Sequence, residues 1–104
     1  MTARKGYLFA ELDVVDAAHF YDEYMSRVQP VLEEYGAVFL AGSDAPVVKE
    51  GGREVKRVVL LEFETLQRAE EFYHSERYQA IIGYRFKSAR SHLYMFEGSG
   101  AQPE

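Results

Sequence analysis

The sequence contains no cysteine, and its three histidines lie far apart along the chain. Without cysteine the protein has no disulfide, no thiolate metal ligand and no thiol nucleophile. The histidines at positions 19, 74 and 92 show neither i, i+4 nor H-x-H spacing. We therefore expect no metal site.

Long runs of one residue type are also missing. No Lys/Arg-rich segment is present and the net charge is -5, which argues against a nucleic-acid partner. No apolar stretch approaches the roughly 20 residues that span a bilayer, and the short polar start (1–5) does not resemble a signal peptide. No glycine-rich phosphate loop or nucleophile elbow appears. We expect a cytoplasmic protein with no membrane partner and no tightly held cofactor.

The 104 residues are 47% hydrophobic and 28% charged, which is ordinary for one globular domain. We expect a single domain over residues 1–98 and a flexible tail over 99–104, where the chain ends in SGAQPE.

The segment from Val55 to Tyr84 organises the rest of the chain. Its apolar run, Val58 to Leu61, indicates a strand covered on both faces and therefore central in a sheet. Thr65 and Ser75 are expected to cap two helical segments that follow. In the second segment, Tyr78, Ile81, Ile82 and Arg85 have helical spacing.

Residues 6–14 alternate as a strand does. One face is aliphatic and suits packing against helices, whereas the other is aromatic and then acidic; the two sets are Leu8, Ala10, Leu12, Val14 and Tyr7, Phe9, Glu11, Asp13. An amphipathic helix follows, capped by Asp16 and closed by Gly36. Pro30 predicts a kink or restart near Gln29.

Three further strands complete the pattern: a short one at 38–40, a brief edge strand at 47–50 that Gly51-Gly52 turns into the central strand, and a last one at 91–97. The main order is β-α-β-β-α-β, an α+β ferredoxin-like fold with an antiparallel four-stranded sheet. Helices cover only one face of such a sheet. Since the other face carries Tyr7, Phe9 and Tyr94 or Leu93, we expect a homodimer that buries it.

Several segments resemble domain-of-unknown-function family 1330: GYLFAELDVVD, EYGAVFLAG, VVLLEFETLQRAEEFYHSERYQAI and a following Arg85. The most specific part is Phe72, Tyr73, Ser75 and Tyr78. This chain departs in having Phe72 where Trp is common and no proline before Glu76. The resemblance implies a dimeric α/β barrel of ferredoxin-like topology, a group that also holds cofactor-free monooxygenases.

Acidic residues in strands are the first candidates for chemistry. If the first strand runs parallel to the central one, Glu11 and Glu62 approach each other and one pKa rises. The alternative is that these strand ends are exposed to solvent and that Arg57, Arg85 or Arg90 pairs with the carboxylates. Glu62 or His74 is the candidate catalytic base. A solvated His74 is the alternative to that role.

Polar-tipped aromatic residues are the second group. The candidate ligand-binding residues are Asp13, Tyr24, Tyr73, Tyr78 and Arg85. A tyrosine suits a pocket wall that orients a polar ligand, and it suits a dimer core equally. Arg85 is expected to hold an anionic group; a solvated or dimer-contact arginine is the alternative.

Two functions fit these features. The first is a small-molecule-binding dimeric barrel, in its enzymatic version a cofactor-independent, monooxygenase-like protein in which a substrate carbanion reacts directly with oxygen. The alternative is a non-catalytic ligand-sensing or structural dimerisation module, in which the same polar groups only hold the dimer together.

Overall fold

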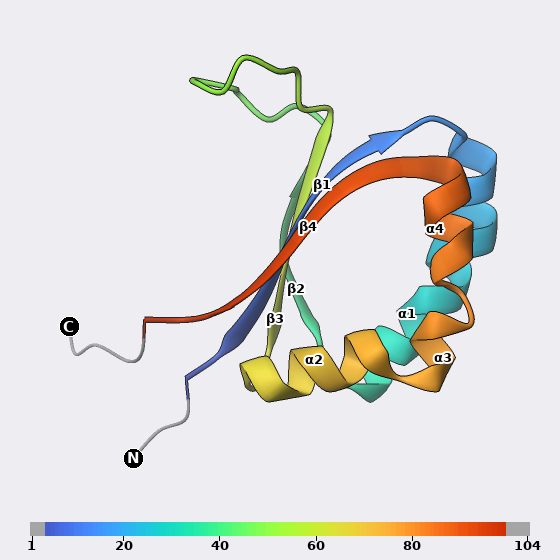
Figure 1. Cartoon of the computed structure of the whole chain (residues 1–104), viewed down its shortest axis with the longest axis vertical. Helices are drawn as coiled ribbons and strands as arrows, with labels where there is room; N and C mark the ends of the chain where they lie inside the picture. Colours follow the sequence, from blue (N-terminus) through green and yellow to red (C-terminus); the bar gives the residue numbers. More distant parts are fainter. Residues whose placement is uncertain (1–3, 100–104) are drawn as a thin grey trace.

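A computed structural model describes residues 4–99. Its elements, in chain order, are β1 (Gly6–Val14), the π-helical η1 (His19–Met25), α1 (Ser26–Glu34), β2 (Val38–Ser43), β3 (Arg57–Phe63), α2 (Leu66–His74), α3 (Glu76–Gln79), α4 (Ile82–Ser88) and β4 (Ala89–Glu97). The sheet has the order β2-β3-β1-β4, and all neighbouring strands are antiparallel. Figure 1 shows all helices on one side of this sheet. The predicted α+β ferredoxin-like fold, with β3 central, is confirmed.

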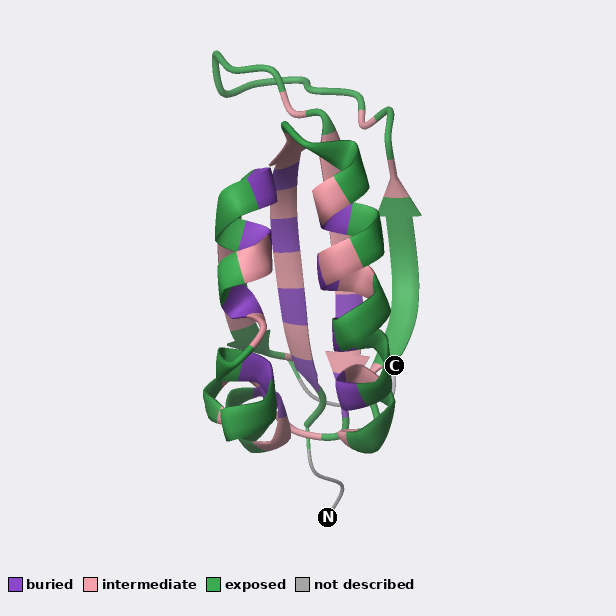
Figure 2. Ribbon diagram, turned by 90° about the vertical axis from the view of Figure 1, so that its right-hand side faces the viewer, coloured by how far each residue is buried: buried purple, intermediate pink, exposed green. Residues whose placement is uncertain are grey.

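The core lies between the sheet and the helices. Leu8, Ala10 and Leu12 of β1 are buried, as are Leu61 and Phe63 of β3, so the alternation predicted for residues 6–14 is confirmed. Figure 2 shows this alternation as purple bands along the strands beneath the helices. The helix layer contributes larger side chains, chiefly Phe20, Val28, Val31, Phe72 and Tyr78.

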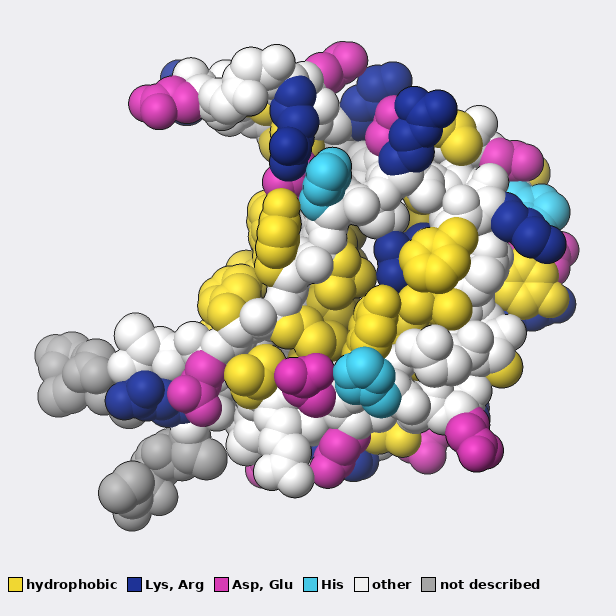
Figure 3. Space-filling view, in the orientation of Figure 1, with side chains coloured by type: hydrophobic (Ala, Val, Ile, Leu, Met, Phe, Trp, Pro, Cys, Tyr) yellow, Lys and Arg dark blue, Asp and Glu magenta, His cyan; other side chains and the backbone are white. Residues whose placement is uncertain are grey.

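The opposite side of the sheet carries no helix, and we name it the open face. It is formed by Tyr7, Phe9 and Glu11 of β1, Val58, Leu60 and Glu62 of β3, and His92, Tyr94 and Phe96 of β4. Tyr94 and Phe96 are exposed. Figure 3 shows a hollow on this side with apolar side chains along it, below the loop between β2 and β3.

The predicted caps are present. The N–H of His19 donates to Asp16 Oδ1 at 3.1 Å, that of Arg68 to Thr65 Oγ1 at 3.0 Å and that of Tyr78 to Ser75 Oγ at 3.1 Å. Gly36 has φ 74° after α1, a conformation that favours glycine.

Three local predictions were wrong. Helix α1 runs through Pro30, and the irregularity lies one turn earlier, where η1 gives way to α1 at Met25–Ser26; a proline disturbs the carbonyl four residues before it, which here is Ser26. Residues 47–50 form no strand. The helix expected after Ser75 is split into α3 and α4 around Ala80 and Ile81.

The ends of the chain limit two other predictions. Residues 1–3 and 100–104 lie outside the described residues, so most of the predicted flexible tail at 99–104 does too. The division into a domain at 1–98 and a tail stays a prediction. Within residues 4–99, no helix combines the length and apolar character that crossing a membrane requires.

Candidate functional site

A cavity of about 90 Å³ lies between the sheet and the helix layer. Its walls are mostly apolar and come from the helix-facing sides of β1 and β3 and from η1 and α1, with Leu8, Val28, Val59 and Leu61 among them. Such a cavity holds an apolar molecule and needs few polar groups to orient it.

Three of the predicted ligand-binding residues meet at the wall of this cavity. The hydroxyl oxygens of Tyr24 and Tyr78 are 2.7 Å apart, and Arg85 Nε donates to the Tyr78 hydroxyl at 3.3 Å. The three residues are 8%, 1% and 4% exposed. The structure brings them together, and their role in binding a ligand stays a prediction.

Each of the three comes from a different helix. Tyr24 lies on the buried side of η1, Tyr78 in α3 and Arg85 in α4. Ser75 holds Tyr78 in place, because its hydroxyl accepts from the N–H of Tyr78 and donates to the carbonyl of Phe72 at 2.8 Å. The ring of Phe72 packs on Tyr78 with centroids 4.5 Å apart. The helix break at Ala80 and Ile81 then turns α4 so that Arg85 faces inward.

Arg85 is a buried cation without a carboxylate partner. Among the ion pairs between residues 4 and 99, none includes Arg85. Burial lowers the pKa of Arg85, but interaction with Tyr78 and Tyr24 outweighs it and raises that pKa above its ordinary value, so the guanidinium is charged. A buried ion costs several kcal/mol when nothing compensates it.

The two tyrosines supply a further hydrogen-bond donor. Burial and the neighbouring Tyr78 raise the pKa of Tyr24 well above 10, although Arg85 lowers it in part, so its hydroxyl stays protonated. Either hydroxyl can be the donor in the bond between them. Because each neutral tyrosine has one O–H, the pair keeps one proton for a ligand. Together with Arg85, the site presents donors and a positive charge.

Tyr73 packs against one member of this cluster, Tyr78. It is half-buried, and its ring centroid is 5.6 Å from that of Tyr78. Tyr73 does not line the cavity, so its contact with a ligand there is not supported.

Glu62 and His74 lie elsewhere. Glu62 is on the open face, accepts a hydrogen bond from the Tyr7 hydroxyl at 3.2 Å and lines a separate polar cleft with Lys5 and Arg68. Burial and this hydrogen bond raise the pKa of Tyr7. His74 has a side chain that is 70% exposed and lies 3.5 Å from Glu70. Neither residue lines the main cavity, and the catalytic role of either stays a prediction.

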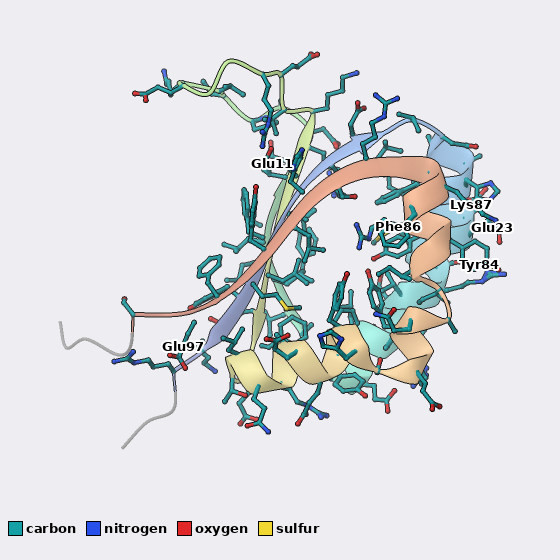
Figure 4. The ribbon with its side chains drawn as sticks, in the orientation of Figure 1. Glu11, Glu23, Tyr84, Phe86, Lys87 and Glu97 are labelled. Carbon is teal, nitrogen blue, oxygen red and sulfur yellow. The ribbon has the colours of Figure 1, made fainter. Side chains whose placement is uncertain are left out.

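The acidic residues of β1 do not form the predicted pair. Glu11 lies opposite Val58 and Glu62 opposite Tyr7, because β1 and β3 are antiparallel. Four residues along a strand separate these two positions by about 13 Å. The expected approach of Glu11 and Glu62 was therefore wrong. Glu11 does pair with an arginine, but that residue is Arg53 and not Arg57, Arg85 or Arg90, which the alternative named. Arg53 donates to Glu11 at 2.7 Å, and Figure 4 shows Glu11 on the side of the sheet away from the helices.

Asp13 is also outside the cavity. Its carboxylate lies 3.7 Å from Lys56, and in the pairing of β1 with β4 it is opposite Arg90. It therefore belongs to a charged end of the open face. No group of three or more His, Asp or Glu side chains within residues 4–99 is placed to hold a metal ion.

Arg57 and Phe39 are among the cavity residues that were missed in the sequence. Arg57 lines the cavity and pairs with Asp44 at 2.7 Å; its alternation with Val59 and Leu61 is the signal that it faces the helices. Phe39 lines it too. A register shift in β2 between Phe39 and Ala41 sets which side Phe39 faces, and nothing in the sequence marks that shift.

Comparison with known protein families gives one match over most of the chain. The family model described as "Domain of unknown function (DUF1330)" matches residues 5–99. None of the curated proteins matches the chain.

Solved structures share the fold at low sequence identity. A protein of unknown function from Rhodopseudomonas palustris, RPA0582, is 14% identical, with a TM-score of 0.73 over 94% of this chain and 85% of that one. SnoaB, a cofactor-independent oxygenase from Streptomyces nogalater, is 12% identical, with a TM-score of 0.66 over 98% and 100%. A Bacteroides thetaiotaomicron protein described as a possible oxidoreductase is 12% identical, with a TM-score of 0.60 over 93% and 100%.

Proposed function

The chain belongs to the DUF1330 family, and from that premise we propose that it binds a small apolar molecule bearing one oxyanion, such as a carboxylate. The observation that carries this proposal is Arg85, 4% exposed at the wall of an apolar cavity and unpaired with any carboxylate of residues 4–99. In the complex the ligand provides the missing negative charge.

The polar end of the ligand is an acceptor. Arg85 uses Nε on Tyr78, and a guanidinium has four more N–H donors, which suit the two oxygens of a carboxylate. The spare hydroxyl proton of the Tyr24–Tyr78 pair adds another donor. A cationic ligand is repelled by the positive charge of Arg85.

The rest of the ligand is apolar. Leu8, Val59 and Leu61 from the sheet and Phe20 and Val28 from the helices surround the remaining space. Each methylene of the ligand buried there contributes about 0.8 kcal/mol. Affinity therefore rises with chain length until the cavity is filled.

Calorimetric titration of the protein with sodium acetate, butanoate and hexanoate tests this. We expect binding that strengthens along the series, and a loss of about tenfold or more in Arg85→Met, since a hydrogen bond to a charged group contributes about 1.5–3 kcal/mol. The variant folds, because an apolar side chain replaces a buried charge of similar size. Arg77→Met, at an exposed ion pair with Glu34, is the matched control. Equal affinity of Arg85→Met and wild type contradicts the proposal.

A second candidate function is cofactor-independent oxygenation, which the structural likeness to SnoaB favours. Here the ligand is a carbon acid whose carbanion reacts directly with oxygen. Arg85 and the tyrosine pair stabilise the oxyanion of its enolate form in a cavity that excludes water. Glu62 or His74 is the proposed base. Neither residue lines the cavity, so this role requires a substrate that extends beyond the cavity or a change of structure that brings one of the two residues to the substrate.

Oxygen uptake separates this candidate from a non-catalytic ligand-sensing or structural module. We measure uptake with an oxygen electrode in the presence of 1,4-dihydroxy-2-naphthoate, a carboxylate whose electron-rich ring carbon reacts with oxygen, and subtract the uptake without protein. Glu62→Gln is expected to abolish uptake, and His74→Asn is tested beside it. Full uptake in both variants excludes both bases. Binding without any uptake supports the non-catalytic alternative.

A further inference from the structure

The cavity is small for the ligand class that its walls suit. Its volume is about 90 Å³, whereas an engineered apolar cavity that binds benzene measures about 150 Å³. A short aliphatic carboxylate fits the space as it stands. A ring-containing carboxylate requires one of the wall side chains to move.

The cavity wall is most exposed to solvent at β2. This edge strand pairs only with β3, and its residues Val38 to Gly42 are exposed. In Figure 2, β2 is the exposed strand that stands beyond the helices, with no helix in front of it. Two exposed rings reach the cavity on this side, Phe39 of β2 and Tyr21 of η1. They are the two exposed side chains of the cavity wall, which puts its mouth between them.

Phe39 is placed over the mouth by the irregularity of β2. Phe39 lies opposite Leu61 and Gly42 opposite Val59, with the register shift between them. Because Leu61 and Val59 share the helix-facing side of β3, Phe39 and Gly42 face the same side although they are three residues apart. Phe39 is thus part of the cavity wall although it is 56% exposed.

Gly42 provides the room for this ring position. A Cβ atom at Gly42 would lie 2.6 Å from Cζ of Phe39 and 3.1 Å from Cε1, closer than carbon atoms approach without repulsion. Any side chain at position 42 therefore displaces the Phe39 ring. The ring can turn outward at low cost, since its outer side already faces solvent.

We propose that Phe39 determines the size of the ligand: its ring, lying against Gly42, closes the cavity to all but short carboxylates and turns outward to admit ring-containing ones. This inference rests on the proposed function. In the closed position the ring adds apolar contact to a short ligand. In the open position a larger ligand occupies the space that the ring leaves and covers the mouth itself.

Titration calorimetry with sodium butanoate and sodium 2-naphthoate tests the inference. In Phe39→Ala we expect the affinity for 2-naphthoate to rise about tenfold, because no ring has to be moved, while the affinity for butanoate stays the same or falls. Gly42→Ala is expected to shift the ratio of the two affinities in the same direction by displacing the ring. Leu40→Ala is the matched control, because Leu40 is an exposed residue of the same strand and lines neither the main cavity nor the polar cleft beside Glu62.

The outcomes separate the inference from the proposed function. An affinity ratio in Phe39→Ala and Gly42→Ala equal to that of wild type overturns the role of Phe39, and the proposed function stands if Arg85→Met still loses both ligands. A change of the same size in Leu40→Ala also overturns it. If Arg85→Met binds both carboxylates as wild type does, or if wild type and Phe39→Ala bind neither, the proposed function fails and the inference with it.

Discussion

At the scale of single residues, the cluster of Tyr24, Tyr78 and Arg85 combines burial with polarity. The hydroxyl of Tyr78 accepts from Arg85 and shares a hydrogen bond with Tyr24, so it connects the cation to the second ring. A positive charge buried in this way adds little to stability, because desolvation offsets the attraction. Under the proposed function, the role of this charge is to bind the anionic group of the ligand.

The raised pKa of Tyr24 predicts a loss of stability in alkali. A tyrosine in the unfolded chain ionises near pH 10, while the folded protein keeps the Tyr24 proton to a higher pH because of burial and Tyr78. Below pH 10 both states are protonated and Tyr24 has no effect. Above pH 10 only the unfolded chain loses this proton, so the free energy of unfolding falls by up to about 1.4 kcal/mol per pH unit.

Urea unfolding of wild type and Tyr24→Phe at pH 9, 10, 10.5 and 11 measures this effect. The variant lacks the ionisable hydroxyl, so we expect its free energy of unfolding to fall less steeply above pH 10. Parallel pH profiles for the two proteins contradict the assignment.

At the scale of elements, two glycines that look alike in the sequence have opposite roles. Gly6 starts β1 against the beginning of α2, and a Cβ there would lie 2.5 Å from the backbone of Leu66. Gly83 is an exposed residue of α4 with nothing within 4 Å of the same position. Close packing explains the first glycine, and no contact requires the second.

Matched Gly→Ala variants follow from this contrast. Gly6→Ala forces α2 away from β1, and we expect a loss of about 1–3 kcal/mol in the free energy of unfolding. Gly83→Ala removes backbone freedom in a helix, and we expect a gain of about 0.5–1 kcal/mol. Thermal and urea unfolding measure both. A gain in Gly6→Ala shows that the start of α2 yields without cost.

At the scale of the whole molecule, the open face leaves aromatic side chains on a hollowed surface (Figure 3). Val38, Tyr94 and Phe96 are about half exposed there, beside the half-buried Tyr7 and Phe9. Contiguous apolar surface of this kind marks an interface. We propose that a second copy of the chain covers it, which makes the protein a homodimer.

Sedimentation equilibrium tests the homodimer. We expect wild type to have the mass of two chains of 11.9 kDa and Phe96→Lys to shift towards one chain, because the open face then carries a charge that a dimer has to bury. Phe86→Lys, at an exposed ring of α4, keeps the wild-type mass. A wild-type protein that sediments as a single chain excludes this use of the open face.

Local chemistry allowed the sequence by itself to determine much of this protein. Strand alternation placed Leu8, Ala10 and Leu12 in the core, since neighbouring side chains point to opposite faces. Side-chain oxygens at Asp16, Thr65 and Ser75 marked helix starts, because they satisfy backbone donors within a few residues. The same short-range logic placed Tyr78 and Arg85 on one side of a single helix, but the structure divides that helix into α3 and α4.

Only the tertiary structure decided which of these groups meet. Antiparallel pairing separates Glu11 from Glu62, and His74 lies in solvent at the end of α2. The break between α3 and α4 turns Arg85 into the cavity beside Tyr24, 61 residues earlier in the chain. The register shift in β2 brings Phe39 over the mouth. Such contacts depend on strand direction, helix orientation and register, which arise from packing across the whole domain and leave no periodic signal in the sequence.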